Sequence, residues 1–181
     1  YDFTALNGGK PVLTSNSGTK CVRDPYIFRG QDGYYYMIAT DMKSSLGWNS
    51  NRSLISWRSA DLITWEDETV IQVADTSKTT RGADRVWAPQ AIWNEERGEY
   101  MIYFALHSNA TGGATVLYYA YSKDMKSFTT QPALLYAPKG GKSAIDADII
   151  YHDGLYYMYF KDESSGGIRV TTSTRMDGGY S

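Results

Sequence analysis

The sequence predicts an all-β fold, a β-propeller of four-stranded antiparallel blades, from three observations. A single plan recurs three times: a short polar or Pro-bearing start, a run of strand-forming residues, a turn, and an aromatic-rich strand. The three copies are residues 23–41, 86–106 and 143–163. Their period is about sixty, which is typical of a blade repeat, since 64 residues separate Asp24 from Ala88 and 58 separate Ala88 from Asp146. Apolar residues alternate or cluster and seldom show the spacing of an amphipathic helix.

Residues 1–14 are expected to form a lone strand, the last strand of a preceding blade. The segment is short and rich in turn residues, and it ends in an apolar pair before Asn16, Ser17 and Gly18 interrupt it. Its Phe3 holds the same place in the repeat as the aromatic residues of the later blades, Trp65 and Phe128.

Residues 22–74 and 85–137 are each expected to form a four-stranded blade. In the first of these, the Asp32-Gly33 pair supplies the backbone freedom that a tight hairpin turn requires. Residues 144–181 are expected to form the first three strands of a further blade. An antiparallel sandwich with accidental internal similarity is the alternative fold.

Residues 1–181 are therefore interpreted as a partial propeller domain of about three blade equivalents. Propellers close with four to eight blades, and five blades of this length need on the order of 300 residues. We expect the chain to be a fragment of a five-bladed protein, or a piece that joins other blades.

The composition excludes several classes of partner and site. The formal net charge is -2 and the basic residues are scattered, so no nucleic-acid partner is expected. No apolar run approaches the roughly 18 residues of a membrane span, so no membrane partner is expected either. Cys21 is the only cysteine, and neither His107 nor His152 has a second ligand at zinc spacing. No cofactor or catalytic metal is therefore expected.

The starts of the three repeats are expected to face one pocket on the propeller axis, because the innermost strand of each blade runs along the central channel. These starts are Arg23-Asp24-Pro25, Trp87-Ala88-Pro89 and Ile145-Asp146-Ala147. Two carboxylates across a pocket are what glycosidic bond cleavage requires, one to activate water or attack the sugar and one to protonate the leaving oxygen. An Asp before Pro is also a common turn residue, so a purely structural role is the alternative.

These stretches resemble glycoside hydrolase family 43, five-bladed propellers that cut arabinose- and xylose-containing plant polysaccharides with inversion. The resemblance runs nearly end to end. The family's first conserved stretch, whose Asp is the general base, is similar to RDPYIFRGQDGYYYMIATDM. Its Trp-Ala-Pro blade start is similar to VWAPQAIWNEERGEYMIYFAL, and the stretch whose Asp tunes the pKa of the acid is similar to SAIDADIIYHDGLYYMYF. The resemblance implies Asp24 as general base and Asp146 as pKa modulator.

The family's general acid has no counterpart in the sequence. The family places a Glu at the start of the next blade, and the chain ends at Ser181 before such a blade. Glu163 stands at the far end of a strand and is expected to lie away from Asp24 and Asp146. The 181 residues alone are therefore expected to be inactive.

The modulator assignment has one alternative, because Asp148 follows Asp146 two residues later. The family's Pro after the modulator is Ala147 here, which departs from its pattern. Strand alternation favours Asp146, since it keeps the three repeat starts in register. The same Asp-Ala-Asp run resembles the start of a calcium loop, but Ile149 and Ile150 break the ligand pattern. A structural calcium is left as an open alternative.

Four further residues are predicted to bind substrate. Trp87 can stack on a sugar ring, and Trp48, in a loop, can line the mouth of the pocket; core packing and a loop staple are the respective alternatives. Arg23 is expected to keep the neighbouring Asp24 ionised and fit to act as a base. Asp41 ends a strand, where it either hydrogen-bonds a sugar hydroxyl or only terminates the strand.

The resemblance implies that the full-length protein cleaves arabinofuranosyl or xylosyl linkages in arabinan, arabinoxylan or xylan, in a secreted or periplasmic location. The expected partners are such a polysaccharide and the remaining blades of the same protein. A carbohydrate-binding propeller without catalysis is one alternative. Another is an invertase-like propeller enzyme, although that reading requires an Asn-Asp-Pro nucleophile and a Glu-Cys acid, and neither occurs in the sequence.

Overall fold

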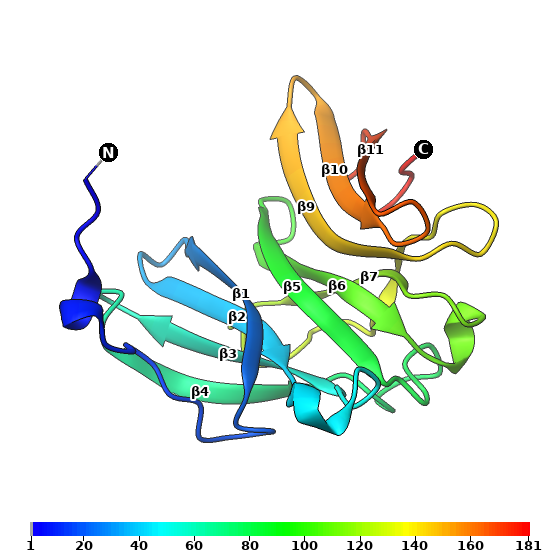
Figure 1. Ribbon diagram of the computed structural model, residues 1–181. Helices are drawn as coiled ribbons and strands as arrows, with labels where there is room; N and C mark the ends of the chain where they lie inside the picture. The colour runs from blue at the N-terminus through cyan, green and yellow to red at the C-terminus, as the bar shows by residue number, and fades with distance from the viewer. Residues whose placement is uncertain (1) are drawn as a thin grey trace.

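The computed structural model describes residues 2–181, which form three antiparallel sheets in chain order (Figure 1). Each sheet is built from consecutive strands joined by hairpins. The first sheet contains β1 (Val22–Arg29), β2 (Tyr35–Asp41), β3 (Ser53–Ser59) and β4 (Trp65–Gln72). The second contains β5 (Arg85–Asn94), β6 (Glu99–His107), β7 (Val116–Ser122) and β8 (Ala133–Tyr136). The third contains β9 (Ala144–His152), β10 (Leu155–Asp162) and β11 (Gly167–Ser173).

The three sheets are successive propeller blades, which confirms the predicted all-β fold. The first strands of neighbouring blades contact each other, β1 with β5 and β5 with β9, so they form the inner side of the arc (Figure 1). The sandwich alternative is wrong, because successive sheets pack side by side around an axis and do not form two stacked layers.

The hairpin turns follow from residues that tolerate a left-handed backbone. Between β1 and β2, Gly33 has a φ of 85° and the carboxylate of Asp32 accepts a hydrogen bond from the Tyr34 amide at 3.2 Å. Between β9 and β10, Asp153 and Gly154 have φ values of 47° and 84°. These are the residue types that a tight turn needs, since Gly and Asp adopt a positive φ at low cost.

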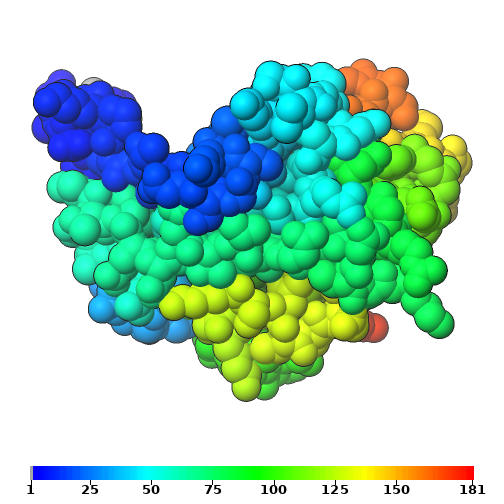
Figure 2. All heavy atoms as spheres, turned by 90° about the horizontal axis from the view of Figure 1, so that it is seen from below, coloured from blue at the N-terminus to red at the C-terminus, as the bar shows by residue number. Residues whose placement is uncertain are grey.

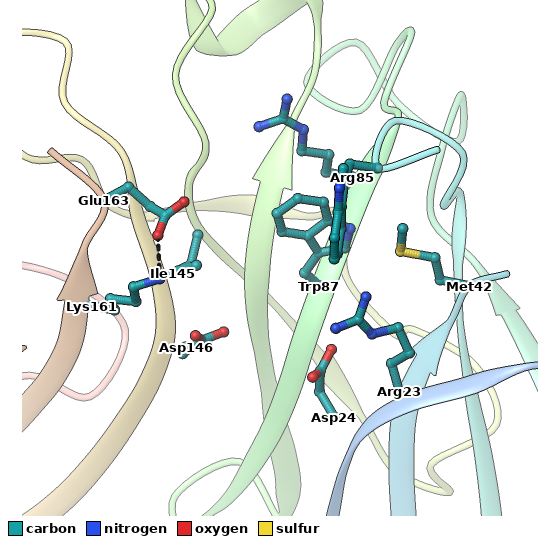
Figure 3. A pocket seen from close by; sticks show the side chains of 10 residues that line it. Arg23, Asp24, Met42, Arg85, Trp87, Ile145, Asp146, Lys161 and Glu163 are labelled. Carbon is teal, nitrogen blue, oxygen red and sulfur yellow. Dashed lines mark ion pairs between the residues drawn. The ribbon is translucent and has the colours of Figure 1, made fainter. Parts of the chain in front are cut away.

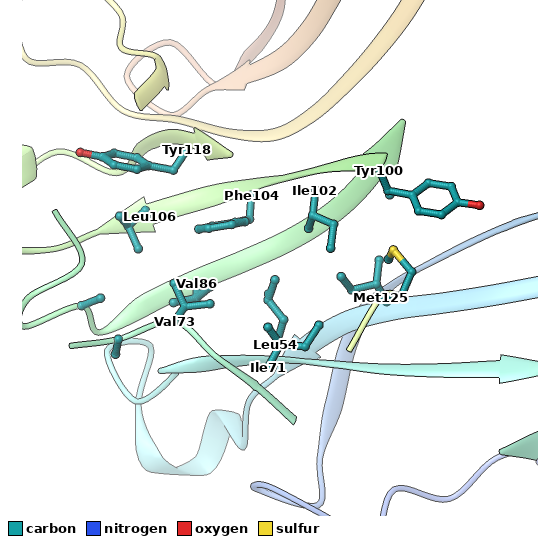
Figure 4. Packing of buried hydrophobic residues seen from close by; sticks show 14 of the residues in the cluster. Leu54, Ile71, Val73, Val86, Tyr100, Ile102, Phe104, Leu106, Tyr118 and Met125 are labelled. Atoms are coloured by element: carbon teal, nitrogen blue, oxygen red, sulfur yellow. The ribbon is translucent and has the colours of Figure 1, made fainter. Parts of the chain in front are cut away.

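Apolar side chains fill the spaces between adjacent blades. The interface of the first two blades buries Leu54, Val86, Phe104 and Leu106 almost completely (Figure 4). The interface of the second and third blades is a separate cluster that includes Met101, Leu117, Ile149 and Met158. Each fully buried side chain of this size contributes about 1.5–3 kcal/mol, so these clusters hold neighbouring blades in a fixed relation.

The prediction of a strand over residues 1–14 is wrong for the part that the structure describes. Residues 2–14 contain no strand, and Leu6–Gly9 forms a short 3-10 turn. Phe3 is 95% exposed, unlike the blade aromatics it was aligned with, and the segment projects from one side of the molecule (Figure 2). A strand needs a hydrogen-bonding neighbour, and this segment lies beside the first blade with only Leu13 packed against it. Tyr1 lies outside the described residues.

Two short helical turns, Ser44–Leu46 and Asn109–Thr111, are the other helical elements of residues 2–181. Both follow the second strand of a blade, after β2 and after β6. Among the described residues no helix has the length and apolar character that crossing a membrane would take.

Candidate active site

The three blades begin with the same backbone irregularity. Asp24, Ala88 and Asp146 have positive φ values of 49°, 45° and 53°. At each position two residues of the first strand oppose one residue of the second strand, so each is a β-bulge. A left-handed non-glycine residue costs on the order of 1–3 kcal/mol, and such strain concentrates at functional sites. The bulges confirm that these three positions are equivalent in the repeat.

The bulged strand starts surround a cavity of about 490 Å³. Asp24 and Asp146 approach it from opposite sides, and Trp87 of β5 lies between them (Figure 3). The lining residues are Arg23, Asp24, Met42, Trp48, Arg85, Trp87, Ile145, Asp146, Lys161 and Glu163. The predicted axial pocket is therefore present, and it collects carboxylates, cations and two indole rings from all three blades.

Asp24 is held by a neighbour on the second strand of its own blade. The hydroxyl of Thr40, a fully buried residue, donates a hydrogen bond to Asp24 Oδ2 at 3.3 Å. The same hydroxyl accepts a hydrogen bond from the amide of Ala88 at 2.8 Å. Thr40 thus satisfies a backbone donor of the second blade and orients the Asp24 carboxylate with one group.

Asp146 lies in a more charged environment. Partial desolvation by the cavity walls raises the pKa of its carboxyl, and the carboxylates of Asp24 and Glu163 raise it further. The ammonium of Lys161 acts in the opposite direction and lowers this pKa. Lys161 Nζ pairs with Glu163 Oε1 at 2.7 Å, as Figure 3 shows. The charge of Asp146 is therefore set by three neighbours that share its cavity.

Two indole rings and two guanidinium groups form the wall opposite Asp146. The rings of Trp48 and Trp87 meet edge to face at 6.1 Å. Arg23 lies over the Trp48 ring at 4.8 Å, and Arg85 lies over the Trp87 ring at 5.1 Å. Trp48 is 58% exposed, so one indole is open to a ligand at the cavity mouth. Aromatic rings beside polar side chains are suited to sugar rings, which have apolar faces and hydroxyl edges.

Five of the six predicted site residues line this cavity, which brings Arg23, Asp24, Trp48, Trp87 and Asp146 together. The expected interaction of Arg23 with Asp24 takes a different form. Among the described residues drawn in Figure 3, no ion pair joins Arg23 to Asp24, and the Arg23 guanidinium lies over the Trp48 ring instead.

Asp41 does not line the cavity, so its predicted role in substrate binding is wrong. Its side chain is buried, and the carboxylate accepts hydrogen bonds from the Thr19 amide at 2.8 Å and from the Thr19 hydroxyl at 2.6 Å. The Ser53 hydroxyl donates a third at 2.8 Å. Asp41 therefore fixes the loop before β1 to the ends of β2 and β3, which is the structural alternative.

Glu163 was predicted to be remote, and that prediction is wrong as well. In an antiparallel hairpin the end of the second strand lies beside the start of the first. Asp162, the last residue of β10, pairs with Ala144 at the start of β9, and the Glu163 amide donates to the Ser143 carbonyl at 3.2 Å. This pairing returns Glu163 to the cavity that Asp146 enters.

Lys161 and Arg85 are site residues that sequence reasoning missed. Arg85 stands two residues before Trp87 on the same strand, so alternation alone places both side chains on one face. Lys161 stands two residues before Glu163, and it pairs with Ile145 across the hairpin. The signal for both was present in the strand period and the hairpin pairing.

The calcium alternative has no support in the geometry. Asp146 and Asp148 lie on strand β9, whereas a calcium loop requires ligands on a turning loop. Over residues 2–181 no group of three or more His, Cys, Asp or Glu side chains is placed to hold a metal ion.

Fold and site together define a propeller whose axial cavity is lined by carboxylates, the groups that glycosidic bond cleavage requires. A family described as a probable glycosyl hydrolase domain, related to glycosyl hydrolase family 43, matches residues 1–181. The chain belongs to this family.

Curated relatives support the same assignment. The chain is 29% identical over 195 residues to an α-L-arabinofuranosidase of Bifidobacterium longum, which covers 95% of this chain and 18% of the relative. It is 27% identical over 150 residues to arabinan endo-1,5-α-L-arabinosidase A of Aspergillus niger, covering 80% of this chain and 43% of the relative. The chain therefore spans less than half the length of these relatives.

Solved structures show the same fold at low sequence identity. A xylan β-1,4-xylosidase from Bacillus halodurans superposes with a TM-score of 0.63 at 15% identity, covering 92% of this chain and 31% of that one. A family 117 glycoside hydrolase from Zobellia galactanivorans gives a TM-score of 0.65 at 18% identity, covering 88% of this chain and 54% of that one. These structures share the fold of this chain, and the family match over residues 1–181 confirms the predicted relation to family 43.

Proposed function

We propose that this chain supplies the water-activating part of an inverting glycoside hydrolase that cleaves arabinofuranosyl or xylosyl linkages in plant cell-wall polysaccharides. One observation carries the proposal: two carboxylates on equivalent bulges, Asp24 and Asp146, enter one axial cavity beside exposed indole. Inverting hydrolysis needs a carboxylate base on one side of the sugar and a carboxylic acid on the other.

Asp24 acts as the general base in this proposal. Its Oδ2 is held by Thr40, which leaves the remaining lone pairs of the carboxylate directed to the cavity for a water molecule. The carboxylate takes a proton from that water as its oxygen attacks the anomeric carbon. Direct attack by water inverts the configuration of the released sugar.

Asp146 acts as the residue that tunes and orients the acid. A negative charge near a carboxylic acid disfavours its ionisation, so an ionised Asp146 raises the pKa of an acid placed next to it. The acid itself is assigned to the part of the complete protein outside residues 1–181. Glu163 is a poor substitute, because its carboxylate is engaged in an ion pair with Lys161. The 181 residues alone are therefore expected to give no turnover.

The substrate assignment draws on the wall of the cavity and on the relatives. Trp48 and Trp87 offer aromatic surface for a pentose ring, and Arg23 and Arg85 offer donors for its hydroxyl groups. Arabinan, arabinoxylan and xylan fit this surface and agree with what the arabinofuranosidase, arabinanase and xylosidase relatives are named for. No cofactor is needed for the reaction as written.

The location and the protein partner follow from the same proposal. A polymeric wall polysaccharide does not cross a membrane, so the complete protein is assigned to a secreted or periplasmic location. The remaining blades are assigned to the free face of the third blade, where Ile150, Ile168 and Val170 are 51%, 71% and 54% exposed. Such an apolar face is suited to pack against a neighbouring blade.

The test is Asp24→Asn in the complete protein, assayed on aryl arabinofuranosides and aryl xylosides. We expect kcat to fall by about 10²–10⁴, the usual contribution of a general base, with binding of arabino-oligosaccharides retained. Asn keeps the size of the side chain and removes only its basicity. Binding without turnover in both the parent protein and the variant would show a carbohydrate-binding propeller without catalysis.

A further inference from the structure

A second cavity, of about 710 Å³, lies at the opposite end of the second and third blades. It is formed where β5 ends and β6 begins, together with the β9–β10 hairpin and the segment after β11. We call it the turn-side groove, and its lining residues are Ile92, Trp93, Asn94, Glu95, Glu96, Arg97, Tyr121, Tyr151, Tyr156, Thr174, Arg175, Met176 and Asp177.

Aromatic side chains form the surface of the groove. Tyr151 is 58% exposed and packs against the Tyr156 ring at 4.8 Å. On the other wall, Arg97 covers the Tyr121 ring at 4.1 Å. Trp93 also lines the groove, and its buried indole N–H has no hydrogen-bond partner in the described part of the chain. The groove therefore offers an exposed aromatic platform.

Both cations that line the groove, Arg97 and Arg175, are paired with carboxylates, and this narrows the kind of ligand that the groove can bind. Arg175 pairs with Asp177 at 2.9 Å, and Arg97 pairs with Glu99 at 2.9 Å. Glu95 and Glu96 add acidic groups and no further cation lines the groove. Among its described lining residues, the groove has no unpaired basic side chains to bind a polyanion, and it is too polar to bind a lipid surface. A neutral ligand with apolar faces and many hydroxyl groups satisfies both the rings and the polar side chains.

We propose that the turn-side groove is a second carbohydrate site, which holds a neutral segment of the polysaccharide away from the catalytic cavity. Tyr151 and Tyr156 are the stacking platform, and Glu96 and the Arg175–Asp177 pair bind the hydroxyl groups. The identity of the glycan rests on the proposed function. Seven residues of β5 separate Trp87 from Asn94, so the two sites are roughly 23 Å apart at ~3.3 Å per strand residue. A bound polymer chain can therefore occupy the groove without blocking the catalytic cavity.

The test compares Tyr151→Ala with Tyr151→Phe in the complete protein carrying Asp24→Asn, which prevents turnover. Binding of debranched arabinan, arabinoxylan and xylan is measured by affinity electrophoresis and calorimetry. We expect Tyr151→Ala to weaken binding of at least one polymer by about fivefold or more, because it removes the stacking ring. Tyr151→Phe should keep most of the affinity, because it retains the ring. Ile63→Ala, an exposed apolar residue in the first blade, is the matched control and is expected to bind as the parent does.

The same Tyr151 variants with Asp24 intact separate this inference from the proposed function. Turnover of a small aryl glycoside is expected to be unchanged by Tyr151→Ala, because that substrate reaches only the catalytic cavity. If polymer binding depends on Tyr151 but the protein with Asp24 intact shows no turnover, the groove is a carbohydrate site and the catalytic proposal is refuted. Equal polymer binding by Tyr151→Ala and Ile63→Ala would overturn the second site, as would a loss of affinity that Tyr151→Phe shares in full.

Discussion

The starts of the first and third blades have the same backbone and different surroundings. Asp24 and Asp146 each stand on a two-residue bulge with a positive φ near 50° and each faces the same cavity. Asp24 meets a neutral hydroxyl, that of Thr40, whereas Asp146 meets Lys161 and Glu163 at the end of its hairpin. The repeat determines which cavity each carboxylate faces. The residues at the end of the second strand of each blade determine the charges and hydrogen bonds around that carboxylate.

The second blade has the same bulged backbone at its start but no carboxylate there. Ala88 has the bulged backbone of its two counterparts, and the adjacent Trp87 enters the cavity in their place. In the proposed function, the same bulge therefore supplies a base in the first blade, an aromatic surface in the second and a charge regulator in the third. Substitutions at the separate blade starts should therefore have different effects.

The largest difference in turnover between a carboxylate that lines the cavity and a neighbour that does not is expected at Asp146. Asp146→Asn should lower kcat of the complete protein by about 10²-fold, in the range of a group that supports proton transfer. Asp148→Asn is the matched control, because Asp148 lies two residues further along the same strand and does not line the cavity. Kinetics on an aryl arabinofuranoside decide between them, and a larger loss for Asp148→Asn would move the modulator assignment to Asp148.

A smaller effect is expected from Thr40→Val, which removes the hydroxyl that holds Asp24. The variant leaves the partly buried amide of Ala88 without an acceptor, so the free energy of unfolding should fall by about 1–3 kcal/mol. Turnover should fall several-fold, since Asp24 loses its orienting contact. Thr40→Ser keeps the hydroxyl and should behave as the parent protein in denaturant unfolding and in kinetics; equal losses for both variants would show that only packing matters.

The smallest effect is a shift in the ionisation of Asp146. Lys161 lowers the pKa of that carboxyl and Glu163 raises it, so Lys161→Met should move the pKa upward and Glu163→Gln should move it downward. As the pH falls, Asp146 should therefore lose its charge earlier in Lys161→Met than in the parent. Titration of the side-chain carboxyl by NMR measures both shifts. Shifts of the same sign in the two variants would exclude this electrostatic account.

Much of the fold could be predicted from the sequence because it is repeated locally. Turn residues, strand alternation and the sixty-residue period each mark the blades, and three copies reinforce one another. The bulged positions were found by register alone, without knowledge of their positive φ. The prediction of an N-terminal strand was wrong because strand pairing is not a local property. Residues 2–14 have no neighbouring strand to bond with, and their Asn, Gly and Pro residues favour turns.

The site was predicted in part for the same reason. Residues at strand starts were identified, since direction and period determine where they point. Glu163 and Lys161 were missed because their position depends on hairpin pairing, which brings a strand end back to a strand start. Asp41 stands at an equivalent strand end, yet its carboxylate is taken up by Thr19 and Ser53. Only the folded structure shows whether an acidic residue at a strand end lines the cavity or is hydrogen-bonded inside the protein.

The central claim is that Asp24 activates water and Asp146 does not. Asp24→Gly and Asp146→Gly test it directly, because glycine accepts the positive φ of both bulges and leaves room for a small anion. Azide needs no base, so added azide should restore turnover of Asp24→Gly by about tenfold or more and release a glycosyl azide of inverted configuration, with no effect on Asp146→Gly. Rescue of Asp146→Gly by azide, with Asp24→Gly unaffected, would contradict the assignment of the base.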